Sequence, residues 1–325
     1  MSPDVSVVMA AYDAERYVEE AIDSVAAQSF AGHELIVVDD GSTDRTPAIL
    51  RERLGFLERA GLATRLIRQD NAGLAAARNA GVRAANGRYV AFLDADDVWH
   101  PELLEASVAA LESDPGACLS FPLYAYVADD GTELGVQSAP TSDRVGLGSL
   151  LVDNPIHSDS GVVVRATAAA RIGPFDEALS GYVGLDYWIR AASGGAGTLK
   201  CVPRVLVRYR RHGAQITSDW RRMEANWTAL LAKAKRLEPD IVAKAEPGMR
   251  AAQYVYWSSL AYAGGDFGSA RALIASAWRA DPVAVLKDRT GPIRTLSCIA
   301  SLLPTRLHRG IRERVARRSG AGRTG

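Results

Sequence analysis

The first half of the chain alternates short runs of β-forming residues with longer helical runs. In residues 15–29, Val18, Ile22 and Val25 fall on one side of a helix. Such alternation is typical of a parallel sheet covered by helices on its faces. Strands are predicted at residues 5–10, 34–38, 65–68 and 89–93, and helices at 15–29, from Thr46-Pro47 onward and at 74–85.

The rest of the chain changes character twice. Residues 116–209 predict shorter strands, with a hairpin turn at Asp129-Asp130-Gly131-Thr132 and a helix at 186–192. The last strands of this part are predicted at 198–202 and 205–209, and beyond Asp219 only helices follow, at 220–237, 241–263 and 267–279. We therefore predict an α/β domain at residues 1–219, a helical appendage at 220–305, and a basic, partly disordered tail at 306–325.

Composition excludes several classes of function. Lys plus Arg and Asp plus Glu number 38 each, so no net field draws the chain to nucleic acid. The N-terminus lacks the pattern of a signal peptide, and the apolar stretch at 295–303 is too short to cross a bilayer. The three cysteines, Cys118, Cys201 and Cys298, are scattered, and we expect them to be reduced and mostly buried in a cytoplasmic protein.

Acidic residues follow two of the predicted strands. Asp39-Asp40 comes directly after residues 34–38, and Asp94-Ala95-Asp96-Asp97 comes after residues 89–93. Ligands of open α/β sheets bind beyond the carboxyl ends of the strands, so we expect both runs to face one crevice. Carboxylates packed this closely repel one another unless a cation lies between them. The pattern indicates a divalent metal, magnesium or manganese, held by carboxylates and substrate phosphates.

Four short motifs, which follow one another along the first hundred residues, resemble those of a known protein family. They are residues 5–12, then 36–44, then 71–74 with 77–81, then 91–97. Taken singly, each acidic run also fits a solvated turn. Together, over about residues 2–213, they resemble the family 2 glycosyltransferases. The resemblance implies an α/β fold of the GT-A type, a Rossmann-like mixed sheet flanked by helices, with residues 1–219 as the catalytic domain.

The resemblance also implies roles for matched positions. Asp40, with Asp39, would bind the nucleotide base, and Asp96 of the Asp-X-Asp motif would hold the metal that bridges the diphosphate. The residues implied in binding the nucleotide sugar are Ala10, Tyr12, Asp39, Asp40, Arg78 and Asp94. The last strand of the domain runs into Tyr209-Arg210-Arg211-His212, a sequence that related enzymes close over the diphosphate. Arg210 would neutralise phosphate oxygens and His212 would ligate the metal; the other interpretation is a basic strand end facing solvent.

The catalytic base is where the sequence departs from the family. A Glu-Asp pair usually precedes the Trp and Arg found here at Trp188 and Arg190, and counting back places that pair on Val183 and Gly184. Neither residue can accept a proton. Asp186 is the nearest carboxylate and is the predicted base, although it could instead cap or pair within its helix. A surface turn is predicted for Asp176 and Glu177, and a structural role for His157.

The predicted function is inverting, metal-dependent transfer of a sugar from a nucleoside-diphosphate sugar, most simply a UDP-sugar, to a glycan or lipid-linked acceptor in cell-surface or exopolysaccharide synthesis. Transfer of a hexosyl type is expected. The alternatives are a degenerate nucleotide-sugar binding protein and a nucleotidyltransferase, although residues 10–16 lack the glycine-rich phosphate loop of the latter. An apolar stripe at 293–303 and the arginines at 306–318 predict peripheral contact with the inner face of the membrane; packing on the catalytic domain is the other interpretation.

Overall fold

The computed structural model describes residues 3–137, 142–194, 196–213, 219–288 and 291–302. The chain divides into two compact units, one of residues Met1–Leu150 and Asn154–Gln215 and the other of Leu151–Asp153 and Ile216–Gly325. In the described residues no helix combines the length and the apolar character needed to cross a membrane. Cys118, Cys201 and Cys298 are buried and free of disulfides, as predicted.

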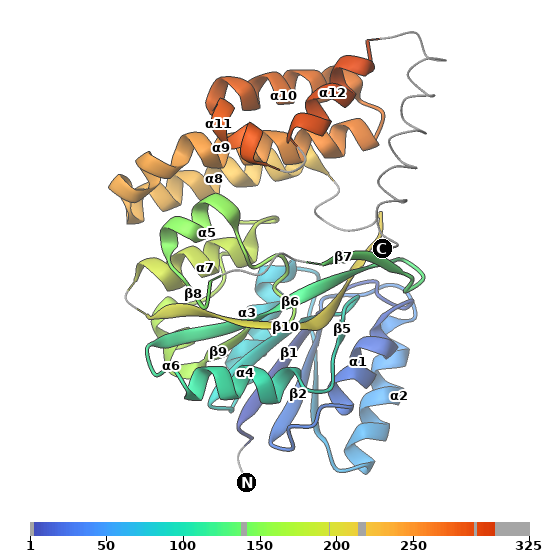
Figure 1. Ribbon diagram of the computed structural model, residues 1–325. Coiled ribbons are helices and arrows are strands. Elements are labelled where there is room, and N and C mark those ends of the chain that lie inside the picture. The colour runs from blue at the N-terminus through green and yellow to red at the C-terminus, as the bar shows by residue number, and fades with distance from the viewer. Residues whose placement is uncertain (1–2, 138–141, 195, 214–218, 289–290, 303–325) are drawn as a thin grey trace. The chain divides into compact units, whose positions relative to one another are not determined.

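Within the described residues, the first unit is built on one mixed sheet of ten strands (Figure 1). Its order is β3-β2-β1-β4-β9-β6-β10-β5, with β7 paired to β6 and β8 to β10. The first four strands are parallel, as predicted, while β9 runs antiparallel to both β4 and β6. The strands are β1 Val5–Ala11, β2 His33–Asp39, β3 Ala63–Arg68, β4 Tyr89–Asp94, β5 Val98–Trp99, β6 Ala117–Ala128, β7 Glu133–Gln137, β8 Arg144–Val145, β9 Val163–Arg165 and β10 Thr198–Arg211.

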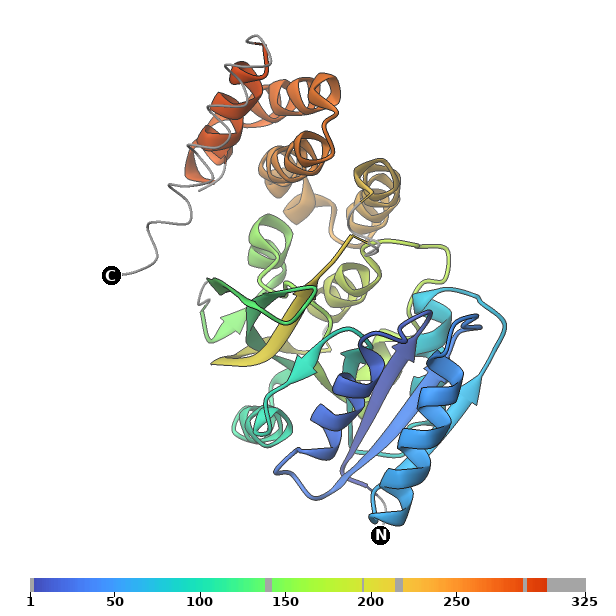
Figure 2. The same cartoon turned by 90° about the vertical axis from the view of Figure 1, so that its right-hand side faces the viewer.

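Successive side chains of a strand point to opposite faces of the sheet. The apolar side chains of β1 therefore lie on both faces, and helices cover each of them. Val7 and Met9 of β1 belong to the core that includes α1, α2 and α4, and Figure 2 looks onto α1 and α2. Val8 faces α3 on the other side, where a Cβ on Gly81 would lie 2.3 Å from Val8 Cγ1. Only a glycine at position 81 lets α3 pack this closely against β1. The helices of this unit are α1 Val18–Ala26, α2 Thr46–Arg59, α3 Leu74–Ala84, α4 Leu103–Glu112, α5 Leu147–Asp153, α6 Ala166–Ile172 and α7 Val183–Ser193.

Two boundaries and one helix cap differ from the sequence predictions. The helix expected at 15–29 begins only at Val18, because residues before it bond to the loop after β2, as in the 3.1 Å bond from Glu15 N to Asp44 Oδ2. The helix predicted from Thr46-Pro47 onward begins at Thr46, but Thr46 does not cap it as its residue type favours: Arg45 holds the cap position, and the Thr46 hydroxyl accepts from the Ala14 amide at 2.8 Å. The two strands expected at 198–202 and 205–209 are one strand, β10, whose pairing with β6 shifts register around Pro203, which has no amide hydrogen to donate.

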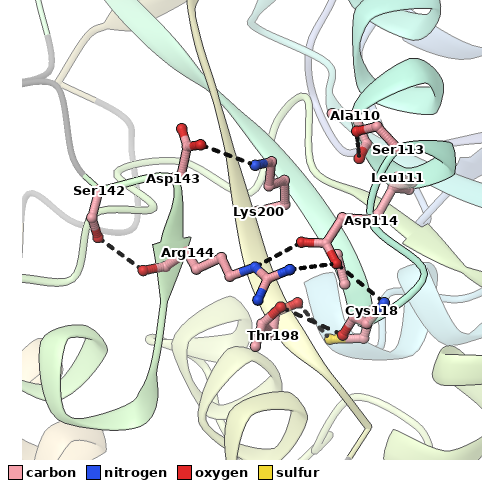
Figure 3. A network of polar contacts seen from close by, with 12 residues as sticks. Ala110, Leu111, Ser113, Asp114, Cys118, Ser142, Asp143, Arg144, Thr198 and Lys200 are labelled. Carbon is pink, nitrogen blue, oxygen red and sulfur yellow. Dashed lines mark hydrogen bonds and ion pairs between the residues drawn. The ribbon is translucent and has the colours of Figure 1, made fainter.

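The predicted hairpin turn joins β6 to β7, and Gly131 takes a positive φ of 84° there. A polar network fixes the short strand β8 against β10 (Figure 3). Arg144 of β8 donates to both oxygens of Asp114, at 2.9 and 3.0 Å, and Lys200 of β10 pairs with Asp143 at 3.3 Å.

The second unit is helical, as predicted. Asp219 and Asp266 accept from backbone amides at the starts of α8 and α10, which explains why these helices begin where they do. Trp227 of α8 packs edge-on against Trp257 of α9, with ring centroids 5.8 Å apart. The helices are α8 Trp220–Leu237, α9 Pro239–Ala263, α10 Phe267–Ala280, α11 Pro282–Lys287 and α12 Gly291–Ala300.

Candidate active site

The two acidic runs meet at one edge of the sheet, as predicted. β1 lies between β2 and β4, and all three strands are parallel. In register, Ala11 stands beside Asp39 and Ala10 stands beside Asp94. The carboxyl ends of β1, β2 and β4 therefore carry both acidic runs side by side.

Asp40 holds the loop that leads into α3. Its side chain is buried and accepts from Gln69 Nε2 at 2.8 Å, from the Ala72 amide at 2.9 Å and from the Gly73 amide at 2.8 Å. Asp39, also buried, accepts from the Ser42 amide at 2.9 Å. Both carboxylates thus shape the loops beside the predicted nucleotide pocket.

The aromatic ring of Tyr12, just after the end of β1, is exposed. Tyr12, predicted to line the base pocket, is 51% exposed, and Ala10 is half-buried at the strand end. Asp13 follows with a positive φ of 44°, and its carboxylate accepts from the Thr43 amide at 2.7 Å. Asp13, which the sequence predictions did not single out, ties the loops after β1 and β2 together.

Arg78 lies buried between two carboxylates. Its Nη2 donates to Asp94 Oδ1 at 2.7 Å and its Nη1 to Asp159 Oδ2 at 2.5 Å. Burial opposes the charge on Arg78, yet Asp94 and Asp159 raise the pKa of the guanidinium. Burial raises the pKa of Asp94; Arg78 works against that rise, while Asp159 and Asp96 add to it. The buried guanidinium of Arg78 therefore donates to the carboxylates of both Asp94 and Asp159, at the sheet edge where the substrate is expected.

Asp96 and His212, the two predicted metal ligands, are paired. His212 Nε2 lies 2.9 Å from Asp96 Oδ2, and the His212 ring stacks on Tyr17 at 5.0 Å between centroids. A carboxylate oxygen is a ligand that manganese and magnesium prefer, and an imidazole nitrogen is a common metal ligand. No group of three or more His, Cys, Asp or Glu side chains able to hold a metal occurs in the described part of the chain. The pair fits a cation whose remaining ligands come from substrate phosphates.

Arg210 fastens the acidic loop to its surroundings. It is buried, with Nε donating to the Asp96 carbonyl at 3.0 Å and Nη2 to Glu20 Oε2 at 2.5 Å. Its amide donates to Asp97 Oδ1 at 2.9 Å. Asp97 is fully buried, and burial together with the charges of Asp96 and Asp94 raises the pKa of its carboxyl well above the usual range. Arg210 therefore contacts the loop of the Asp-X-Asp motif directly.

Asp186, the predicted base, is buried in α7 and pairs within its own helix. Its side chain is 2% exposed and pairs with Arg190 of the same helix at 2.9 Å. This is the helix pairing that the sequence left open as the alternative role. Gly184, one helical turn before Trp188 in α7, faces Asp159, and Trp188 Nε1 donates to Asp159 Oδ1 at 3.2 Å.

Asp176 and Glu177 precede α7, as the predicted surface turn requires, and Glu177 accepts from Asn79 at 2.9 Å. The His157 ring packs edge-on against Tyr124 at 6.4 Å, in keeping with a structural role. Asp159 and Tyr17 are site residues that the sequence predictions missed. Neither belongs to a recognisable motif, and Asp159 lies in Ser158-Asp159-Ser160, which has the composition of an ordinary turn.

Comparison with known proteins gives the family. The model of glycosyl transferase family 2 matches residues 6–169. TuaG of Bacillus subtilis, a glycosyltransferase named for teichuronic acid biosynthesis, is 40% identical over 132 residues, which are 41% of this chain and 51% of TuaG. An uncharacterized glycosyltransferase of Haemophilus influenzae is 30% identical over 250 residues, 72% of this chain and 73% of the relative.

Solved structures share the fold at low identity. TarS of S. aureus, residues 1–349 with UDP-GlcNAc, has a TM-score of 0.61 at 17% identity, covering 92% of this chain and 89% of that one. The mannosyltransferase PcManGT of Pyrobaculum calidifontis, with GDP-Man and Mn²⁺, has a TM-score of 0.60 at 22% identity, covering 92% and 85%. The mixed sheet flanked by helices is thus the GT-A fold predicted from the motifs. On its motifs, its fold and its relatives, this chain belongs to glycosyl transferase family 2.

Proposed function

We propose that this chain moves a sugar from a nucleoside-diphosphate sugar to an acceptor hydroxyl, with inversion at the anomeric carbon and with help from a divalent metal. The observation that carries the proposal is the cluster at the ends of β1 and β4. There Asp94 and Asp96 lie at the end of β4 and in the loop after it, where Arg78 of α3 pairs with Asp94 and His212, just after β10, pairs with Asp96. A diphosphate needs cations, and a departing sugar needs a carboxylate nearby; this edge offers both.

The comparisons support the class of donor. TarS was crystallised with UDP-GlcNAc and with UDP, and PcManGT with GDP-Man and Mn²⁺. We infer a UDP-hexose or a related nucleotide sugar as the donor and manganese or magnesium as the metal. The name of TuaG supports an acceptor in cell-surface or exopolysaccharide synthesis, either a glycan or a lipid-linked sugar.

The roles of this chain's residues follow from their contacts. Asp40 would shape the base pocket through the loop at Ala72 and Gly73. Arg78 would orient Asp94 toward the donor sugar. Asp96 and His212 would hold the metal, which when bound supplies Lewis-acid stabilisation of the charge on the leaving diphosphate.

We also propose that residues 1–219 form the catalytic domain and that residues 220–305 are an appendage in a cytoplasmic protein. Peripheral contact with the inner face of the membrane is supported by α12, where three large side chains are more than half exposed at helical spacing: Ile293, Leu296 and Ile299. The arginines predicted to strengthen this contact lie at 306–318, outside the described residues.

A second function, nucleotide-sugar binding without transfer, is favoured by one observation. The position that carries the base in related enzymes is Gly184, and the nearby Asp186 is ion-paired in its helix. The two functions differ in turnover and share donor binding.

A donor panel tests the proposal. The chain is incubated with UDP-Glc, UDP-GlcNAc, UDP-Gal and GDP-Man, with Mn²⁺, with Mg²⁺ or with EDTA, and released nucleoside diphosphate is measured. We expect metal-dependent release from at least one donor, slow with water alone as the acceptor. Calorimetric binding of UDP without release from any donor would support the binding function instead.

A further inference from the structure

The space in front of Gly184 is filled by a carboxylate from another part of the chain. A Cβ built on Gly184 would lie 1.7 Å from Asp159 Oδ1 and 2.2 Å from its Cγ. No side chain could occupy position 184 unless Asp159 moved. Glycine at 184 therefore leaves room for Asp159, which comes from the segment before β9.

The segment around Asp159 is anchored to the end of β4. The Asp94 amide donates to Ser160 Oγ at 2.9 Å, and the Gly161 amide donates to the Phe92 carbonyl at 2.7 Å. On the other side the Tyr124 hydroxyl donates to the Ser158 carbonyl at 2.8 Å, where both groups are buried. These bonds fix Asp159 beside Asp94.

Two donors orient the Asp159 carboxylate. Arg78 Nη1 binds Oδ2 at 2.5 Å, and Trp188 Nε1 binds Oδ1 at 3.2 Å. Each carboxylate oxygen accepts about two hydrogen bonds, so these contacts leave capacity on both oxygens. The side chain is 20% exposed, against 2% for Asp186. Asp159 is thus both held in place and open to solvent.

We propose that Asp159 is the general base of the transfer. The inference rests on the proposed function. The acceptor oxygen forms a bond to the anomeric carbon as its proton passes to a carboxylate oxygen of Asp159. The bond from that carbon to the diphosphate oxygen breaks, and its electron pair leaves with the nucleoside diphosphate. Asp94, on the other side of Arg78, stays with the donor.

A purely structural role for Asp159, as a counter-ion of Arg78, makes a different prediction. In that case loss of the carboxylate disturbs Arg78 and slows reaction with every nucleophile alike. A general base matters only for nucleophiles that must lose a proton. Azide attacks the anomeric carbon with no proton to remove, so it separates the two roles.

The experiment compares Asp159→Asn with the wild-type chain, using the donor that wild type hydrolyses in the panel. Release of nucleoside diphosphate is measured with water alone and with added sodium azide, and glycosyl azide is quantified by mass spectrometry. We expect hydrolysis to fall by about a hundredfold or more while azide transfer falls far less. Calorimetric affinity for UDP with Mn²⁺ should stay near wild type, whereas the melting temperature should fall, because Arg78 keeps only Asp94 as a charged partner. Asp143→Asn, which removes an exposed carboxylate paired with Lys200, is the matched control and should hydrolyse normally.

A second variant guards against simple misfolding. Asp159→Ala combined with Gly184→Asp supplies a carboxylate from α7 into the space that Asp159 leaves. We expect this pair to recover part of the hydrolysis that Asp159→Ala alone loses, whereas Gly184→Asp alone collides with Asp159 and is impaired.

Equal losses of hydrolysis and azide transfer in Asp159→Asn would overturn the proposal in favour of the counter-ion role. Normal hydrolysis in Asp159→Asn, or a selective loss of hydrolysis in Asp186→Asn, would also overturn it. A wild-type chain that releases no nucleotide from any donor refutes the proposed function itself, and this inference with it.

Discussion

His212 Nε2 lies 2.9 Å from Asp96 Oδ2, although 116 positions separate the two residues in the chain. The contact joins the end of β10 to the loop after β4, and the Arg210 amide reinforces it by donating to Asp97. The two predicted metal ligands are therefore brought together by the position of the end of β10 next to the loop after β4.

Asp96→Asn should abolish metal-dependent release of nucleoside diphosphate, because an amide does not supply the anionic ligand that a hard cation needs. We expect a loss of at least about a hundredfold, measured in saturating Mn²⁺, with an unchanged melting temperature. Asp130→Asn, an exposed aspartate of the β6–β7 turn, serves as the control. Turnover near normal in Asp96→Asn would remove the metal role.

Asp40→Ala should weaken nucleotide binding more than it slows the chemical step. The change leaves the Ala72 and Gly73 amides without their acceptor and frees the loop that borders the pocket. We expect the Kd for UDP to rise about tenfold, equivalent to about 1.4 kcal/mol. Calorimetry measures it, with exposed Asp70→Asn as the control. An unchanged Kd would place Asp40 outside the nucleotide pocket.

Asp186→Asn distinguishes the two roles that the sequence left open for this residue. If Asp186 serves its ion pair with Arg190, the variant loses a charged hydrogen bond worth about 1.5–3 kcal/mol and unfolds at lower denaturant. We expect this loss of stability, measured by urea unfolding, with turnover kept when the protein is folded. The reverse result, wild-type stability with turnover reduced about a hundredfold, would assign the base to Asp186.

Contact with an anionic membrane should depend on the exposed face of α12 and on the arginines beyond it. Each basic residue near an anionic surface adds about 1 kcal/mol, so the chain should pellet with phosphatidylserine vesicles and not with phosphatidylcholine vesicles. Deleting residues 304–325, or changing Leu296 and Ile299 to Ser, should abolish pelleting.

Equal pelleting with both kinds of vesicle would refute this contact. So would pelleting that survives the deletion.

The first four strands of the sheet and its acidic edge could be predicted from the amino-acid sequence alone. Alternating periodicities predicted the first four strands, and Asp39-Asp40 and Asp94–Asp97 could be placed together because parallel strands end at one edge. The family could also be predicted, because each of the four motifs is a short run of neighbouring residues that can be recognised in the sequence without knowledge of the fold. The cysteines could be predicted to be free and buried because they are scattered along the sequence and match neither a disulfide framework nor a metal-ligand spacing.

Only the tertiary structure decided which side chains meet across long separations. Asp159 is 81 positions from Arg78 and lies in an unremarkable polar turn, so no local pattern marks it. Its place depends on β9 returning antiparallel beside β4 and on α7 presenting a glycine to it. Arg210, expected at a phosphate, likewise turned out to bond to Glu20 and to the Asp96 carbonyl. Periodicity records which face of an element is buried, whereas the partner of a polar side chain depends on how distant elements pack.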